Sequence, residues 1–145
     1  MDYQDRDPYP IPRRYHWFTD YSYIPTVAAA PELFGFADNK TATTLARIFS
    51  GTILASSIFT RAEWGAVKVL PYQAHVALDF ASGLTALAMP WLAGFAGHRA
   101  ARNTFLGMGI VGITVGLLSG ILTGPREMPT DEYASSRQAA KRYRP

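Results

Sequence analysis

Four long apolar segments follow one another along the chain, separated by short polar stretches. Residues 80–97 and 104–123 contain no charged side chain. Uncharged apolar runs of about 18 residues or more are long enough for a helix to cross the hydrocarbon core of a bilayer. A soluble helical bundle would instead need a polar stripe on each helix. The pattern therefore predicts an integral membrane protein.

The same pattern predicts four helices, at residues 21–36, 41–60, 72–95 and 103–123. The first is short and contains Pro25 and Pro31, so its periodicity alone would favour an interfacial or re-entrant segment. Residues 61–71 form a connector, predicted to lie at the membrane interface. Gly124 and Pro125 mark the end of the last helix, as such pairs commonly do.

An internal repeat supports the first helix. Residues 20–42 match residues 79–101 at an offset of 59 positions. Asp20 aligns with Asp79, and the two segments share a turn pattern in which proline, glycine and phenylalanine recur at fixed spacing. The turn residues are Pro31, Gly35 and Phe36 in the first copy and Pro90, Trp91, Gly94 and Phe95 in the second. A repeat fixes the architecture before any argument about single residues.

The fold class predicted from these observations is all-α, an integral membrane bundle of four transmembrane helices built as two tandem helical hairpins. The first hairpin covers residues 20–60 and the second covers residues 72–124. Residues 1–19 are predicted to be an extended arm, because Pro8, Pro10 and Pro12 block helix formation. Residues 125–145 are predicted to be a polar, basic tail.

Charge gives the predicted orientation. Only 17% of the residues are charged, the net charge is +3, and most of the basic residues lie in the tails or in the connector. The positive-inside rule then places both termini in the cytoplasm, with the protein as a multi-pass component of the inner membrane. This distribution suits anionic lipid rather than nucleic acid. The N-terminal segment has no apolar core of a cleavable signal peptide, and the absence of cysteine excludes disulfides and thiolate chemistry.

Small residues at helical spacing are candidates for helix packing. In lipid, helices approach closely where small residues line one face. From Gly112 onward the glycines of the last helix recur every four residues, with Gly109 one turn earlier, and a small face on the second helix could match them. The predicted packing residues are Gly51, Ala55, Gly109, Gly112, Gly116, Gly120 and Gly124. Packing within the chain and a subunit interface both remain open at this stage.

Two charged side chains of the first hairpin are candidates for an ion pair. Glu32 and Arg47 fall at similar depth across the first hairpin turn, and the equivalent positions of the second hairpin are Trp91 and Leu106. Joint loss of acid and base is typical of a structural ion pair, so a Glu32–Arg47 bridge is predicted, with Arg47 reaching the headgroups alone as the alternative.

The repeat acids Asp20 and Asp79 share one depth near the cytoplasmic side. They could cap helix amides, pair with Arg61, or form a proton or cation site, with capping or pairing favoured. His75 lies one turn before Asp79 and is a candidate ligand for a pigment held by a partner. His16 and His98 are expected to be solvated. No cofactor or metal is predicted, and bound lipid or pigment is left open.

A family resemblance follows from the second repeat. The segments His75–Asp79, Ser82-Gly83-Leu84 and 90–95, with the preceding Lys68-Val-Leu-Pro71, resemble the bacterial SPW-repeat membrane proteins. That family is built of one or two units of paired transmembrane helices, which implies the same tandem hairpins. This chain has Met89-Pro90-Trp91 and Ala30-Pro31-Glu32 where the family has Ser-Pro-Trp. The family implies no defined activity.

The sequence contains no catalytic motif for hydrolysis, phosphate binding or metal-dependent proteolysis. We therefore expect a non-enzymatic accessory or scaffolding subunit that packs against a larger membrane complex, respiratory or photosynthetic, or that forms a homo-oligomer. The alternative is a small proton or cation carrier or channel that uses Asp20 and Asp79 as a pair between the repeats.

Overall fold

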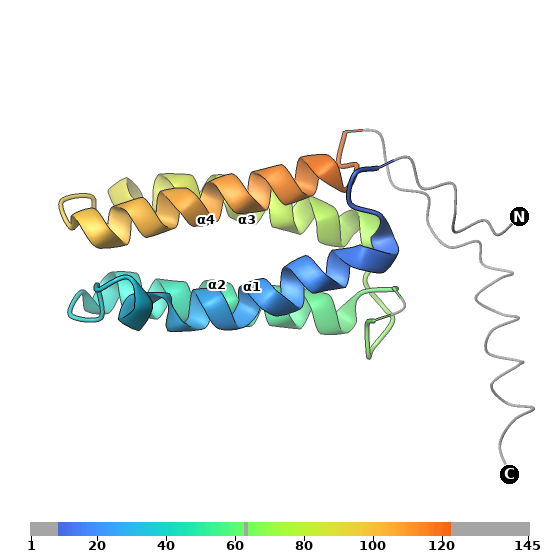
Figure 1. Cartoon of the computed structure of the whole chain (residues 1–145), viewed down its shortest axis with the longest axis horizontal. Coiled ribbons are helices and arrows are strands. Elements are labelled where there is room, and N and C mark those ends of the chain that lie inside the picture. The colour runs from blue at the N-terminus through green and yellow to red at the C-terminus, as the bar shows by residue number, and fades with distance from the viewer. Residues whose placement is uncertain (1–8, 63, 123–145) are drawn as a thin grey trace, which may run out of the picture.

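The computed structural model describes residues 9–62 and 64–122, which form four α-helices. They are α1 (Arg13–Leu33), α2 (Lys40–Phe59), α3 (Tyr72–Leu92) and α4 (Arg99–Leu118). The described residues contain no strand, only one isolated bridge between Thr60 and Leu70 in the connector. The predicted all-α class is therefore confirmed. Figure 1 shows two helical hairpins side by side, with both hairpin turns at one end and the connector at the other.

The two hairpin turns have the same geometry. Gly35 has a φ of 72°, in the left-handed region that favours glycine, and the next residue donates a backbone hydrogen bond to the proline five positions back. That bond joins Phe36 to Pro31 in the first turn and Phe95 to Pro90 in the second, each at 2.9 Å, and Gly94 has a φ of 75°. The predicted repeat turn is thus present in both hairpins, with both phenylalanines buried and Trp91 exposed.

The helices that follow the turns also begin alike. Asn39 accepts a hydrogen bond from the backbone N–H of Ala42, and His98 accepts one from Ala101. Each cap satisfies one of the backbone donors that a helix start leaves unpaired. His98 is therefore a capping residue whose side chain is 28% exposed.

The start of α1 corrects one prediction. Residues 13–19, expected to belong to an extended arm, form the first turns of α1, with Pro12 just before the helix. A proline at this position loses nothing, because the first backbone N–H groups of a helix have no partner inside it. Pro25 and Pro31 both lie inside this single helix of 21 residues. Residues 1–8 of the predicted arm lie outside the described residues.

The end of α4 corrects a second prediction, the position at which the last helix ends. The helix ends at Leu118 rather than at 123, and Gly120 follows it with a φ of 93°. The backbone N–H of Ile121 donates to the carbonyl of Gly116 at 3.1 Å, which closes the helix with a left-handed glycine. Gly120 thus belongs to a turn instead of a packing face. Gly124, Pro125 and the predicted basic tail lie outside the described residues.

Glycines hold α3 and α4 close together. A β-carbon added to Gly83 would lie 2.7 Å from the backbone nitrogen of Ile113, and one added to Gly109 would lie 2.7 Å from the carbonyl oxygen of Gly83. Gly112 and Gly116 face the backbone of α3 in the same way. The predicted glycine face of α4 therefore packs within the chain.

The predicted small face on α2 makes no helix contact within the chain. Gly51 and Ala55 are exposed, and nothing lies within 4 Å of a β-carbon added to Gly51. The buried positions of α2 lie one step away around the helix, at Ala42, Ala46, Ser50, Ile53 and Ser57. The second hairpin packs through glycines of its own, so α4 does not need a small face on α2.

The hairpins are in contact near both of their ends. Near the turns, the phenylalanines Phe36, Phe95 and Phe105 belong to one buried apolar cluster that draws on all four helices. Near the connector, the contact is a buried group of polar side chains. Cavities lie between these two contacts, along α1 and α4.

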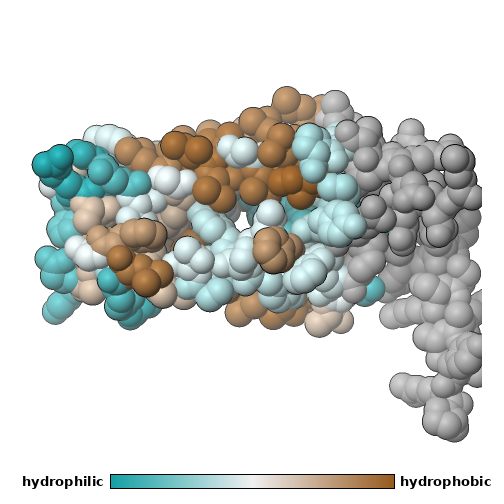
Figure 2. All heavy atoms as spheres, in the orientation of Figure 1, coloured by the Kyte–Doolittle hydropathy of each residue, from teal (hydrophilic) through white to brown (hydrophobic). Residues whose placement is uncertain are grey.

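Two of the four helices, α2 and α4, are long and apolar enough to cross a membrane. Only 28% of each of these two spans is buried inside the chain. Figure 2 shows an apolar surface along α4, polar side chains at the hairpin turns, and a hollow between α1 and α4.

Candidate metal centre

Two histidines and two aspartates converge where α1 meets α3 at the connector end. His16 and Asp20 come from the start of α1, and His75 and Asp79 come from the start of α3. In each helix the two residues are four positions apart, so both side chains lie on one face. One ligand atom from each of the four lies within 4.8 Å of all the others. Both histidines are fully buried, and the aspartate side chains are 6% and 10% exposed.

The distances within the group are short and nearly uniform. The two Nε2 atoms lie 3.2 Å apart. His16 Nε2 lies 3.3 Å from Asp20 Oδ1 and 3.1 Å from Asp79 Oδ2. His75 Nε2 lies 2.9 Å from Asp20 Oδ2 and 3.3 Å from Asp79 Oδ2. Each imidazole therefore faces both carboxylates as well as the other imidazole.

A hydroxyl group lies behind each imidazole. Ser119 Oγ is 2.9 Å from His16 Nδ1, and Thr60 Oγ1 is 3.0 Å from His75 Nδ1. These hydroxyls come from the segments that follow α4 and α2. A third hydroxyl, that of Ser57, donates to Asp20 Oδ2 at 2.9 Å. All four helices or their ends thus hold the group in place.

The hydrogen bonds of Thr60 fix the proton of His75. The Thr60 hydroxyl donates its single hydrogen to the carbonyl oxygen of Ser56 at 2.6 Å, so it can only accept from His75. His75 Nδ1 is then the donor. In a neutral imidazole this leaves the lone pair on Nε2, directed at two carboxylates and a second imidazole. Such a cluster of acceptors needs a cation among them, either protons on the rings or a metal ion.

Aromatic rings cover the histidine side of the group. Trp64 from the connector stacks on His16 with ring centroids 6.1 Å apart, and Tyr72 meets the same ring edge-on at 5.5 Å. The indole N–H of Trp64 donates to the carbonyl oxygen of Arg13 at 3.2 Å. This contact ties the connector to the start of α1. The imidazoles are therefore shielded from the connector side.

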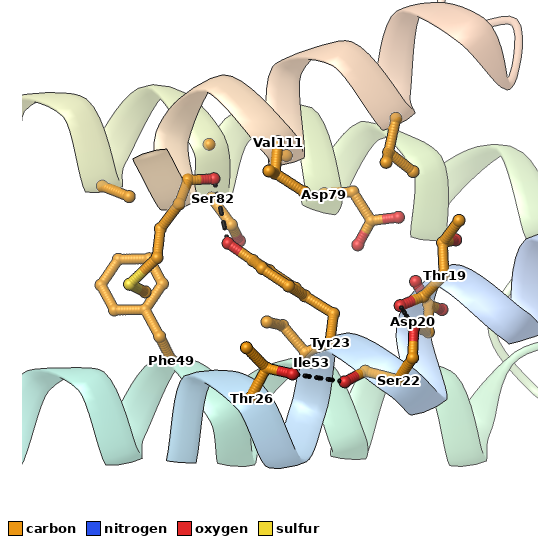
Figure 3. A pocket seen from close by; sticks show the side chains of 15 residues that line it. Thr19, Asp20, Ser22, Tyr23, Thr26, Phe49, Ile53, Asp79, Ser82 and Val111 are labelled. Carbon is orange, nitrogen blue, oxygen red and sulfur yellow. Dashed lines mark hydrogen bonds between the residues drawn. The ribbon is translucent and has the colours of Figure 1, made fainter. Parts of the chain in front are cut away.

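The carboxylate side faces a cavity of about 280 Å³. Asp20 and Asp79 line this cavity and neither histidine does. Figure 3 shows the two carboxylates at one end, with Tyr23 extending from α1 toward α4. The Tyr23 hydroxyl donates to the carbonyl oxygen of Met108 at 3.1 Å and bridges the two hairpins.

The donor set, two imidazole nitrogens and two carboxylates, is of the kind that zinc binds. Zinc in proteins binds imidazole nitrogen and carboxylate oxygen at about 2.0 Å, which places neighbouring ligand atoms about 3.3 Å apart in a tetrahedron. The separations that involve a histidine nitrogen run from 2.9 to 3.3 Å. Histidine ligands of zinc also commonly have a hydrogen-bond partner on the second ring nitrogen, as Thr60 and Ser119 provide here.

Haem does not fit the same residues. The two Nε2 atoms are 3.2 Å apart, too close to bind opposite faces of one porphyrin iron. His75 is fully buried with both ring nitrogens engaged inside the chain. His75 is predicted as a ligand for a pigment held by a partner. In this structure neither of its ring nitrogens is accessible to such a pigment.

The other candidate residues lie elsewhere. The predicted bridge between Glu32 and Arg47 is formed, with Arg47 Nη2 donating to Glu32 Oε1 at 2.7 Å, on the exposed surface. Asp20 and Asp79 do not cap helices or pair with Arg61. They pair with histidines, because His16 lies inside α1 rather than in a solvated arm.

His16 is the residue that sequence reasoning missed, and the repeat contained the signal. At the offset of 59 positions, Pro12 aligns with Pro71, His16 with His75, and Thr60 with Ser119. The repeat therefore begins at Pro12 rather than at Asp20, and this longer repeat pairs the two histidines.

No protein-family model, curated protein or solved structure matches this chain. The resemblance to the SPW-repeat proteins therefore stays a prediction, and the site has to be interpreted from its own chemistry.

Proposed function

We propose that this protein is a membrane-embedded helical protein that binds one divalent transition-metal ion, preferentially zinc, between its two hairpins. The observation that carries the proposal is the convergence of His16, Asp20, His75 and Asp79, with a hydroxyl group behind each imidazole. This site deepens the alternative predicted from sequence, a cation site made by the repeat acids.

Charge balance supports a metal over an empty polar pocket. Two carboxylates and two neutral imidazoles carry a net charge of −2, which is costly to bury away from water. One divalent cation would make the site neutral, and each of the four donor groups could then bind the cation through a lone pair. The same residues could be balanced by protons, and the experiment below separates the two.

Exposed apolar surface supports the membrane part of the proposal. A core helix of a soluble protein is mostly buried, whereas only 28% of the apolar window of α2 and of α4 is buried inside the chain. Large apolar side chains exposed on these two helices include Ile48, Leu54, Phe59, Ile110, Leu117 and Leu118. Surface of this kind suits lipid.

The accessory-subunit function, with a larger complex or a second copy as partner, stays a prediction. The glycine face of α4 no longer supports it, since Gly109, Gly112 and Gly116 are packed against α3 within the chain. A carrier or channel would use the same centre, and metal binding is the step that this alternative shares with the proposal.

The test is metal content and affinity of the full chain purified in mild detergent. After chelator treatment and zinc titration we expect one tightly bound zinc per chain. The His75→Ala variant should not bind zinc. His98, the third histidine of the chain, provides the control. His98→Asn should retain zinc, because the equivalent Asn39 caps its helix in the same way. Equal zinc binding by wild type and His75→Ala would refute the proposal.

A further inference from the structure

The metal centre is closed on one side and open on the other. Trp64 and Tyr72 cover the imidazoles, and both histidine side chains are 0% exposed. The carboxylates of Asp20 and Asp79 instead form one end of the 280 Å³ cavity. Anything that reaches the ion must therefore arrive between the two carboxylates.

We infer that the cavity is a binding site for a small neutral molecule whose donor atom occupies a further coordination position on the metal. This inference rests on the proposed metal site. Zinc sites that keep an accessible position bind water or substrate there and can expand to five ligands. A purely structural zinc site would be enclosed on every side by protein.

The lining of the cavity favours a molecule with a polar head and an apolar body. Beside the carboxylates, the walls carry the hydroxyl groups of Ser22 and Ser82. Toward the hairpin turns the lining becomes apolar, with Phe49, Ala86 and Met108. Pockets for small molecules commonly combine an apolar lining with a few polar groups that fix the orientation.

Charge decides between a neutral and an anionic ligand. A divalent metal with two carboxylates and two neutral imidazoles is already neutral. An anion would add one negative charge in a site that is nearly removed from water, which is unfavourable. A neutral oxygen or nitrogen donor, such as an alcohol, a carbonyl or an azole, leaves the charge balanced.

Tyr23 limits the length of this molecule. Its hydroxyl bridges to the Met108 carbonyl, and both residues also line a second cavity of about 390 Å³ toward the hairpin turns. A ligand that fills the first cavity therefore meets the Tyr23 ring before it can reach the second. We expect short molecules to be preferred over long chains.

The experiment uses the full chain loaded with Co²⁺ in detergent, because the visible absorption of this ion reports its coordination. Pyrazole, a small neutral donor, should change the spectrum saturably while the metal content stays constant. Azide, an anion of similar size, should bind at least about ten-fold more weakly, a difference of about 1.4 kcal/mol. Ser82→Leu on α3 and Val111→Phe on α4 each place a larger side chain in the lining of the cavity. Each should retain cobalt and lose the response to pyrazole.

Thr85→Leu is the matched control, since Thr85 is an exposed residue of α3 that does not line the cavity. It should behave as the wild type. A cobalt spectrum that saturating pyrazole leaves unchanged would overturn the inference and leave the proposed metal site standing. Loss of the metal on addition of pyrazole would overturn it as well. Absence of cobalt binding altogether would refute the proposed function itself.

Discussion

The two hairpins follow one plan and pack their helices by different means. Between α3 and α4, glycines bring the backbones together, and a β-carbon at Gly83 would overlap α4. In the first hairpin, the position equivalent to Gly109 is Ser50, whose hydroxyl donates to the carbonyl oxygen of Ile24 at 2.9 Å. Ile24 itself is the equivalent of Gly83. The first hairpin thus uses side chains where the second uses close backbone approach.

At the polar centre, in contrast, the two hairpins contribute equivalent residues. Each hairpin contributes one histidine, one aspartate four residues later, and one hydroxyl from the end of its second helix. The two halves differ in whether that hydroxyl belongs to Thr60 or Ser119. They differ also at Ser57, whose hydrogen bond to Asp20 has no counterpart because the equivalent residue is Gly116. Packing positions differ between the copies and the candidate ligands do not. This contrast indicates that the centre needs both halves together, whereas each hairpin can be stabilised in its own way.

The largest expected effect comes from removing one carboxylate charge from either half. Asp20→Asn and Asp79→Asn should each weaken zinc binding by more than about 100-fold, the upper end of what loss of an outer partner costs. Each of these carboxylates contacts both imidazoles, so the two losses should be alike. Zinc titration of the two variants measures this. Loss of affinity in one variant alone would show that the halves are not equivalent.

Exchanging a packing residue between the hairpins should have the next largest effect. Gly83→Ile introduces the residue of the first hairpin at the closest approach of α3 and α4, and overpacking of this kind costs about 1–3 kcal/mol. Unfolding in a denaturing detergent should show that loss. Gly51→Ala is the control, because the space around Gly51 is open and alanine favours a helix. Equal stability of Gly83→Ile and wild type would mean that the glycines do not determine the packing.

The hydroxyl groups behind the imidazoles should have a smaller effect. Thr60→Val keeps the shape of the side chain and removes the acceptor that holds the Nδ1–H of His75. Loss of such an outer partner typically lowers metal affinity about 10- to 100-fold. Ser119→Ala should have a similar effect through His16. Thr52→Val, which removes an exposed hydroxyl of α2, should change nothing. Unchanged affinity in Thr60→Val would contradict a role in orienting the ring.

Much of this fold could be predicted from the sequence. Charge-free segments located the later helices, and the recurring proline, glycine and phenylalanine located both turns. The main difference lies in the N-terminal segment, where Pro8, Pro10 and Pro12 predict an extended arm up to residue 19. Pro12 instead precedes the first turn of α1, where a proline is tolerated.

The candidate site was predicted only in part, for a physical reason. Asp20 and Asp79 stood out as acids between apolar residues, and a cation site was one of the interpretations left open. Their partners depended on how α1 and α3 approach each other, which the pattern within one helix does not encode. Only the repeat carries that information, since equivalent residues of two parallel copies can meet at the axis between them. His16 and His75 do so, with Nε2 atoms 3.2 Å apart.

The ion pair of the first hairpin should have the smallest effect. Glu32 and Arg47 form a 2.7 Å contact, but their side chains are 53% and 59% exposed, and exposed pairs contribute about 0–1 kcal/mol. The second hairpin closes the same turn with Trp91 and Leu106 at these positions. A double-mutant cycle with Glu32→Gln and Arg47→Gln should therefore give a coupling energy below about 1 kcal/mol. The double variant Glu32→Trp/Arg47→Leu should melt within a few degrees of wild type. A coupling of several kcal/mol would mean that the pair is shielded from water in its native surroundings, and that the two turns are not interchangeable.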